Sequence, residues 1–226
     1  MGRRGAGILS IEDGAFVGSG QSSIGSETGA NGAVTLAGRG TGWTVGGDLI
    51  VGHEGIGSLN IGAETTVIAS GLVSVADQLG SSGSLLVNGA ISGSSIQVHA
   101  GGWLGGAGAI NGNTSMAGTV APGNSIGTLT VTGNYTQRPD SIYEVELDDT
   151  GASDLITVSG TAMIEGGGVN VVPLGGYLLD HDYTILRDGA VLHADHPIER
   201  AITRAIRSEN AFGSVGLSPS RTRASS

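Results

Sequence analysis

The sequence predicts an all-β fold, a right-handed parallel β-helix with coils of about 25 residues. A short phrase, in which a glycine precedes two aliphatic residues spaced two apart, recurs at residues 7–11, 32–36, 57–61 and 83–87. The central aliphatics Leu9, Val34, Leu59 and Leu85 therefore recur at intervals of 25 or 26 residues. No helical periodicity surrounds these phrases, and the composition is rich in glycine and poor in aromatics. A period in this range indicates stacked units that bury their apolar faces against their neighbours.

Each repeat unit is expected to contain at least two short strands and two loops. A spacing of two places both aliphatics on one face of a strand. A second apolar phrase precedes the next unit, at Ile24-Gly25, Val51-Gly52 and Val75-Ala76. Stacked coils would rise by about 4.8 Å, the usual distance between paired strands. Sandwiches and propellers are the alternatives, but their units are longer and carry more aromatics.

The composition fits a solenoid better than a compact globular core. The 226 residues include 43 glycines and no cysteine, and only 4% are aromatic. A solenoid needs only a thin ladder of Val, Leu and Ile, with glycine at corners where φ is positive. The hydrophobic fraction of 38% and the regular glycine positions argue against a disordered chain. The absence of cysteine is compatible with secretion through a periplasm.

The charge distribution argues against nucleic acid and anionic membranes as partners. The formal net charge is −10, and all ten basic residues are arginine. Six of these arginines follow Leu186, so the body of the chain is strongly acidic. No apolar run is long enough for a membrane helix, and residues 1–4 lead directly into the first repeat. We therefore expect neither a transmembrane helix nor a signal peptide in this sequence.

A different, glycine-rich pattern covers residues 101–186. It comprises residues 101–112, 117–131, 133–137, 143–147, 153–160 and 183–186. The segment resembles the passenger-associated transport repeat of bacterial autotransporters, whose pertactin-like passengers are mostly right-handed parallel β-helices. On this resemblance the positions assigned to a folding-nucleus motif are Gly105, Gly106, Gly108, Pro122, Gly123, Asn124, Ser125, Gly127, Leu129, Val131 and Tyr135.

The resemblance implies a domain organisation and a role. Residues 1–100 would be repeat coils, residues 101–186 the transport repeat and junction coils, and residues 187–226 an atypical helical or disordered tail. The chain would be a fragment of a passenger of type V secretion, a non-enzymatic surface stalk, adhesin or interaction module without a cofactor. Its location would be the bacterial cell surface, the outer membrane or the medium. Host surface proteins, matrix proteins or glycans would be its partners, and the outer-membrane barrel of the full-length family is not found in the sequence.

Three groups of residues resemble catalytic or metal sites. Residues 123–127 fit the nucleophile-elbow pattern around Ser125, but the following residues 128–132 alternate as in a strand, so a corner serine is expected. Residues 180–182 and 193–196 offer His and Asp ligands, but no further cluster in the sequence completes a tetrahedral ligand set, so no zinc site is expected. Glu144 and Glu146 alternate with apolar residues and are expected on a solvated face.

The alternative function is a β-helical carbohydrate-active enzyme, a polysaccharide lyase or hydrolase. Such sites combine paired carboxylates with cationic residues, and the repeat body carries only Arg39 and Arg138. Of the two tryptophans, Trp103 is expected to pack and Trp43 to lie on the surface. Neither tryptophan identifies a sugar site by itself.

The repeat pattern stops after Leu186. Residues 195–199 read as a helix N-cap followed by proline, and Ile198, Ile202 and Ile206 are four apart. This predicts a short amphipathic helix through about Ser208, followed by a polar end. A frameshift, an early stop or a gene fragment would explain the change. A stand-alone product with a separately encoded barrel and a helical cap on the solenoid are the alternatives.

Overall fold

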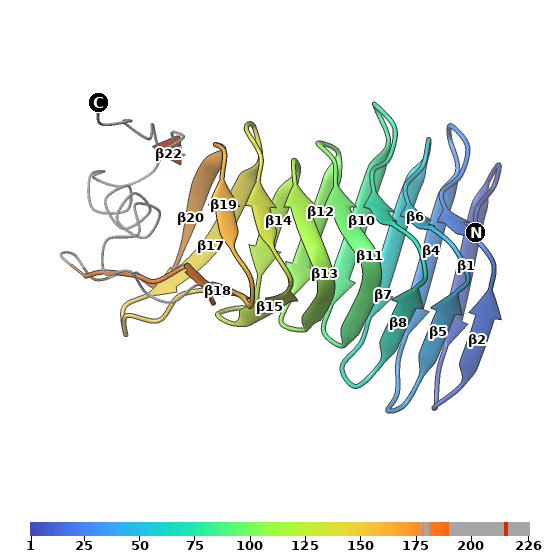
Figure 1. Cartoon of the computed structure of the whole chain (residues 1–226), viewed down its shortest axis with the longest axis horizontal. Coiled ribbons are helices and arrows are strands. Elements are labelled where there is room, and N and C mark those ends of the chain that lie inside the picture. The colour runs from blue at the N-terminus through green and yellow to red at the C-terminus, as the bar shows by residue number, and fades with distance from the viewer. Residues whose placement is uncertain (177, 179–180, 190–214, 217–226) are drawn as a thin grey trace, which may run out of the picture.

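The computed structural model is a parallel β-solenoid, so the predicted all-β, parallel β-helix is confirmed (Figure 1). It describes residues 1–176, 178, 181–189 and 215–216. All regular elements in these ranges are strands. The described residues contain no helix that is long and apolar enough to cross a membrane. The tail helix expected between residues 197 and 208 lies outside the described residues.

Three columns of stacked strands form the walls of the solenoid. The first column contains β1 (Ala6–Ile11), β4 (Asn31–Leu36), β7 (Ile56–Ile61), β10 (Ser82–Val87), β12 (Gly102–Gly106), β14 (Thr119–Pro122), β17 (Ile142–Asp148) and β20 (Gly168–Leu174). The second contains β2 (Phe16–Ser19), β5 (Gly42–Val45), β8 (Thr66–Ala69), the first part of β11 (Ala90–Val98) and of β13 (Ala109–Met116), β15 (Thr128–Thr132), β18 (Leu155–Val158) and β21 (Leu186–Asp188). The third contains β3 (Ser22–Ile24), β6 (Leu49–Val51), β9 (Val73–Val75), the last part of β11 and β13, β16 (Tyr135–Gln137) and β19 (Ala162–Ile164).

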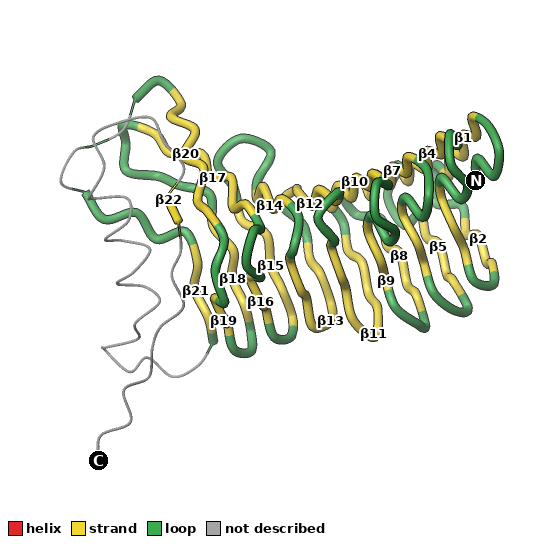
Figure 2. Tube along the Cα trace, turned by 90° about the horizontal axis from the view of Figure 1, so that it is seen from above, coloured by secondary structure: helices red, strands yellow, loops and turns green. Residues whose placement is uncertain are grey.

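The strand pairs within the columns are parallel, with one exception. Strand β22 (Val215–Gly216) pairs antiparallel with β20 at the end of the first column. Figure 2 shows the first column along one side of the stack and the second and third along the other. The predicted junction at residue 100/101 does not interrupt the ladder, because β10 pairs directly with β12. The division of the chain into repeat coils (residues 1–100) and junction coils (residues 101–186) remains a prediction, because it concerns the sequence pattern and not the strand ladder.

The repeat phrase sets the register of the first column. Leu9 pairs with Val34, Val34 with Leu59, and Leu59 with Leu85. Their side chains point into the solenoid, where Leu59 and Leu85 are fully buried. The core is thus one continuous apolar cluster along the stack. Each coil is stabilised by the coils above and below it, as the period predicts.

The glycine of the repeat phrase allows the backbone of one corner to approach the first column. A Cβ on Gly57 would lie 2.2 Å from the backbone nitrogen of Gly52 and 2.5 Å from the carbonyl oxygen of Ile24. The glycine therefore serves close packing of backbone on backbone at this corner. The register continues the same glycine position through Gly32 and Gly83.

The two tryptophans lie on opposite faces of their strands. Trp43 is 5% exposed and belongs to the core, with Nε1 donating to Ser19 Oγ at 2.9 Å. It has the same parity as Val45, which is also buried, so strand alternation directs both inward. Trp103 pairs in register with Ser84 on the outward row and lies over Gly105. The expectation of a surface Trp43 is wrong.

Candidate functional site

Residues 123–127 form the loop between β14 and β15, within the junction segment, by which we mean residues 101–186. Gly123 has φ of 91° and Ser125 has φ of 106°, so two residues of the loop lie in the left-handed region. The strand β15 follows the loop directly, as expected from its alternation, and no helix follows Ser125. Ser125 is therefore a corner residue and does not sit on a strand-to-helix elbow.

Asp154, one coil further along the chain, holds this loop. Its Oδ1 accepts the backbone N–H of Gly127 at 2.8 Å, and its Oδ2 accepts the backbone N–H of Glu146 at 2.9 Å. A Cβ on Gly123 would lie 2.4 Å from Asp154 Oδ1, so the carboxylate occupies the space that a side chain at Gly123 would need. We call Asp154 with the backbone of Gly123, Gly127 and Glu146 the Asp154 clamp.

Burial governs the protonation of this clamp. Asp154 is 1% exposed, and burial raises the pKa of its carboxyl to about 6 against an ordinary value of 3.8. The two backbone donors lower the pKa and the charges of Glu146 and Glu144 raise it further, but burial is the largest effect. A buried carboxyl of this kind holds two coils together and is closed to a substrate.

The residues predicted to form a folding-nucleus motif have three different structural roles. Leu129, Val131 and Tyr135 point inward and are at most 1% exposed. Asn124 Nδ2 donates to Asn88 Oδ1 at 2.8 Å, which links two coils on the outside. The remaining positions are backbone corners and strand ends of β12, β13, β14 and β15, namely Gly105, Gly106, Gly108, Pro122, Gly123, Ser125 and Gly127.

A buried polar chain replaces part of the aliphatic core in these coils. Tyr135 OH donates to Gln137 Oε1, and Gln137 Nε2 donates to Ser141 Oγ at 2.7 Å. Ser141 Oγ in turn donates to the carbonyl oxygen of Arg138 at 2.6 Å. All three side chains are 1% exposed, and burial raises the pKa of the Tyr135 hydroxyl far above its ordinary value. No role for Gln137, Ser141 or Asp154 was predicted from the sequence.

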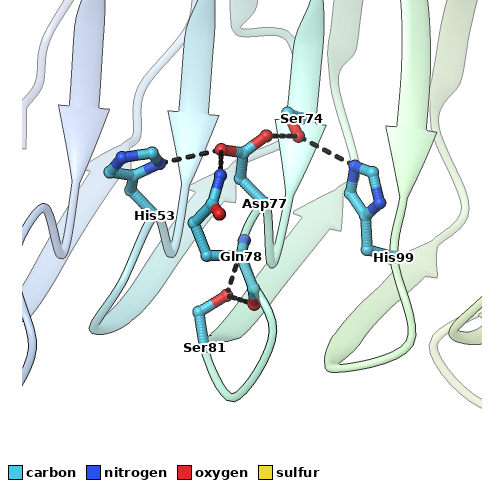
Figure 3. A network of polar contacts seen from close by, with 6 residues as sticks. All are labelled: His53, Ser74, Asp77, Gln78, Ser81 and His99. Atoms are coloured by element: carbon cyan, nitrogen blue, oxygen red, sulfur yellow. Dashed lines mark hydrogen bonds and ion pairs between the residues drawn. The ribbon is translucent and has the colours of Figure 1, made fainter.

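A second polar cluster lies at another corner, between the third and first columns (Figure 3). His53 Nδ1 lies 2.8 Å from Asp77 Oδ2, and Gln78 Nε2 donates to the same oxygen at 2.8 Å. Ser74 Oγ donates to Asp77 Oδ1 at 2.9 Å and lies 3.2 Å from His99 Nε2. These four partners come from three successive coils. The cluster was not predicted from the sequence, although its members from successive coils are separated by about one repeat period.

The protonation of this cluster follows from its hydrogen bonds. Burial would raise the pKa of Asp77, but the hydrogen bonds from Gln78, Ser74 and His53 outweigh it and hold the pKa below its ordinary value. Asp77 is therefore ionised at neutral pH. Ser74 gives its single hydroxyl proton to Asp77, so His99 Nε2 must donate its N–H to Ser74 Oγ.

The cluster has the residue types of a Ser-His-Asp triad but a different order of contacts. In a triad the histidine accepts the serine proton and the acid orients that histidine. Here the acid accepts the serine proton, and the histidine bonded to Asp77 is His53 rather than His99. Ser74 is also 1% exposed. Ser74 in this arrangement is held as a structural donor and is not activated as a nucleophile.

The other sequence candidates bring no ligand set together. Tyr143, Val145 and Leu147 point into the core, and Glu144 and Glu146 lie on the other face, as predicted. Within the described residues no three His, Asp or Glu side chains are grouped to hold a metal ion. Residues 193–196 and Asp180 lie outside the described residues. His181 contacts Tyr183 edge-on, with ring centroids 4.8 Å apart.

Comparison with known proteins gives one partial match. The chain is 34% identical over 123 residues to an extracellular serine protease of Serratia marcescens. The matched segment covers 54% of this chain and 11% of the relative, so the chain spans only a small part of the protein it resembles. No protein-family model matches the chain, and no solved structure matches it.

This comparison corrects one expectation from the sequence. The role expected from the sequence, a surface stalk, adhesin or interaction module, was non-enzymatic. That expectation is contradicted, because the relative found by comparison is an extracellular serine protease. A β-helix fold alone does not distinguish an enzyme from a stalk or an adhesin, because function depends on the site that the fold carries.

Proposed function

We propose that the chain is the coil-forming part of an autotransporter passenger, in an exported protein of the extracellular serine protease type. The main support for this proposal is the parallel ladder of the first column, which runs without interruption from β1 to β20 and forms an elongated body. The similarity to the extracellular serine protease of Serratia marcescens supports an extracellular location and a protease as the kind of protein to which the chain belongs. The net charge of −10 favours neutral or cationic partners over nucleic acid.

In this proposal the proteolytic activity belongs to the polypeptide that carries the coils. The direction of the hydrogen bonds at Ser74 supports a nucleophile other than Ser74. The test is reaction of the exported protein with a fluorophosphonate probe, followed by peptide mapping and a casein-hydrolysis assay. Labelling of one serine, with loss of hydrolysis when that serine is replaced by alanine, is the expected result. Absence of both labelling and hydrolysis, or labelling at Ser74, would contradict the proposal.

We further propose that residues 101–186 act as a folding nucleus. The Asp154 clamp and the buried Tyr135–Gln137–Ser141 chain support this role, because satisfied buried polar groups favour one register over its alternatives. The coils of residues 101–186 therefore carry register information in these buried polar contacts, in addition to that of their aliphatic ladder. A nucleus that forms early would serve as the surface onto which the remaining coils add.

A matched pair of variants tests the nucleus. Asp48 Oδ1 accepts the backbone N–H of Leu72 at 2.8 Å, which is the same type of contact between neighbouring coils in the first part of the chain. We expect Asp154→Ala to slow refolding and Asp48→Ala mainly to accelerate unfolding, as measured by stopped-flow fluorescence in urea. Equal effects of the two variants on the refolding rate would contradict a nucleus in residues 101–186.

A further inference from the structure

A hollow of about 240 Å³ lies on the outward face of the third column, over β11, β13 and β16. It is located where β11 carries a register irregularity between Ser92 and Ser95 against β13. Two rows of outward side chains line it across three coils. The rows are formed by Ser95, Asn113 and Asn134, and by Gln97, Ser115 and Thr136.

The polar groups of this hollow are oriented by the coils and present unused donors. Asn113 Oδ1 accepts the backbone N–H of Asn134 at 2.9 Å, and Asn134 Oδ1 accepts the backbone N–H of Thr161 at 3.0 Å. Both amide oxygens are thereby fixed, which leaves the Nδ2 groups as donors. The side chains of Gln97 and Thr136 have no hydrogen-bond partner among the described residues. The hollow therefore offers oriented amide donors together with hydroxyl groups that both donate and accept.

The charge of the site selects a neutral ligand. All six lining residues named above are uncharged, and the chain as a whole carries a formal charge of −10. The guanidinium of Arg138 near the edge is already engaged, since Nε donates to Ser115 Oγ at 3.1 Å and Nη1 to Glu165 Oε2 at 3.1 Å. An anionic polymer would meet a negative protein without a free cation in the hollow.

The repeat of the hollow matches an extended chain of sugar rings. Polar side chains occupy equivalent positions from coil to coil at about 4.8 Å, the spacing of paired strands. This is close to the length of one pyranose unit in an extended glycan, so each successive ring would meet polar side chains of the two rows. Met163 pairs in register with Thr136 and is 53% exposed, which adds apolar surface for the C–H face of a ring at the end of the row.

We propose that this hollow is a binding site for a neutral oligosaccharide that runs along the solenoid axis across β11, β13 and β16. The ligand hydroxyls accept from the amide groups of Asn113, Asn134 and Gln97 and exchange hydrogen bonds with Thr136. This site lies on the third column and is separate from both the Asp154 clamp and the cluster around Asp77.

The test is isothermal titration of the whole chain with cellohexaose, chitohexaose and mannohexaose, with hexagalacturonate as the anionic comparison. The test variant is Gln97→Ala with Thr136→Ala, which removes two side chains without internal hydrogen bonds. The control is Asn111→Ala on the second-column part of β13, where Asn111 Nδ2 donates to Ser92 Oγ at 3.2 Å. Circular dichroism of each variant checks that the fold is retained.

The expected result is binding of at least one neutral hexasaccharide, weakened at least tenfold in the double variant and unchanged in the control. Binding that is equal in all three proteins would place the ligand elsewhere and overturn the proposal. Binding of hexagalacturonate alone, or of none of the four probes at millimolar concentration, would overturn it as well.

Discussion

The carboxylate of Asp154 accepts the backbone N–H of Gly127 at 2.8 Å although the two residues belong to successive coils. The same carboxylate accepts the N–H of Glu146 at 2.9 Å, so one buried side chain holds a left-handed loop and a strand of the first column. A single residue thereby fixes the register of two coils. This arrangement makes the junction segment sensitive to pH.

The Asp154 clamp predicts that stability decreases as pH rises through about 6. The folded pKa of Asp154 lies near 6, above its ordinary value of 3.8, so the folded state binds more protons than the unfolded state between these values. The contribution is fully present below pH 4 and is lost above pH 6, with a size of about 2–3 kcal/mol for a shift of roughly two units. Urea unfolding at pH 4 and pH 7 measures it.

The control for this prediction is Asp154→Asn, which mimics the neutral acid. We expect this variant to lose the part of the pH dependence that arises from Asp154, with the difference between wild type and variant largest above pH 6. An identical pH profile in the two proteins would show that Asp154 has an ordinary pKa in the folded chain.

The buried tyrosine chain predicts a strongly non-additive pair of substitutions. Tyr135→Phe removes the donor to Gln137 Oε1 and leaves a buried acceptor without its partner, at a cost of about 1–3 kcal/mol. Gln137→Leu in the same chain removes that acceptor, so the double variant is expected to recover part of the loss. A double-mutant cycle from urea unfolding measures the coupling. Additive effects would show that the two side chains do not depend on each other.

The fold was predictable because the coil period and strand alternation act together. The repeat phrase places Leu59 and Leu85 in register and in the core, as found. The parity argument applies equally to Trp43, whose burial follows from its spacing to Val45 and was missed because the residue was considered alone. Strand alternation therefore decides whether a side chain points into the core or toward the solvent.

The polar contacts between coils were harder to predict, for two different reasons. Ser74 and His99 are 25 residues apart, so the period itself aligns them, and superposing the repeats would have found the pair. Asp154 and Gly127 are 27 residues apart, in a part of the chain where coil length varies. The paired residues Leu85 and Leu104 are 19 residues apart, and the paired residues Leu104 and Val120 are 16 residues apart. Without a constant period the sequence does not indicate which loop a carboxylate reaches.

The cluster around Asp77 predicts an acid-sensitive contribution of the opposite sign. The pKa of Asp77 is held below its ordinary value in the folded state, so its stabilising effect is present above the unfolded pKa and is lost as pH falls through the folded one. Asp77→Asn is expected to cost about 1–2 kcal/mol at pH 6, since hydrogen bonds to an ionised group are lost. Urea unfolding at pH 6 and pH 3 should show a difference between the two proteins that shrinks in acid. A difference that grows in acid would contradict the ionised state of Asp77.

The glycine of the repeat phrase predicts a large difference between two Gly→Ala substitutions. A Cβ on Gly57 would lie 2.2 Å and 2.5 Å from backbone atoms of Gly52 and Ile24, which belong to the corner segments of two coils. Gly57→Ala is therefore expected to destabilise the chain by roughly 3 kcal/mol, at the upper end of ordinary overpacking. Gly18, on the outward face of β2, has no atom within 4 Å of an added Cβ, and Gly18→Ala is expected to be neutral or to stabilise by about 0.5 kcal/mol. Urea midpoints of the two variants, compared with wild type, measure the difference, and similar midpoints would show that the corner backbone can move aside.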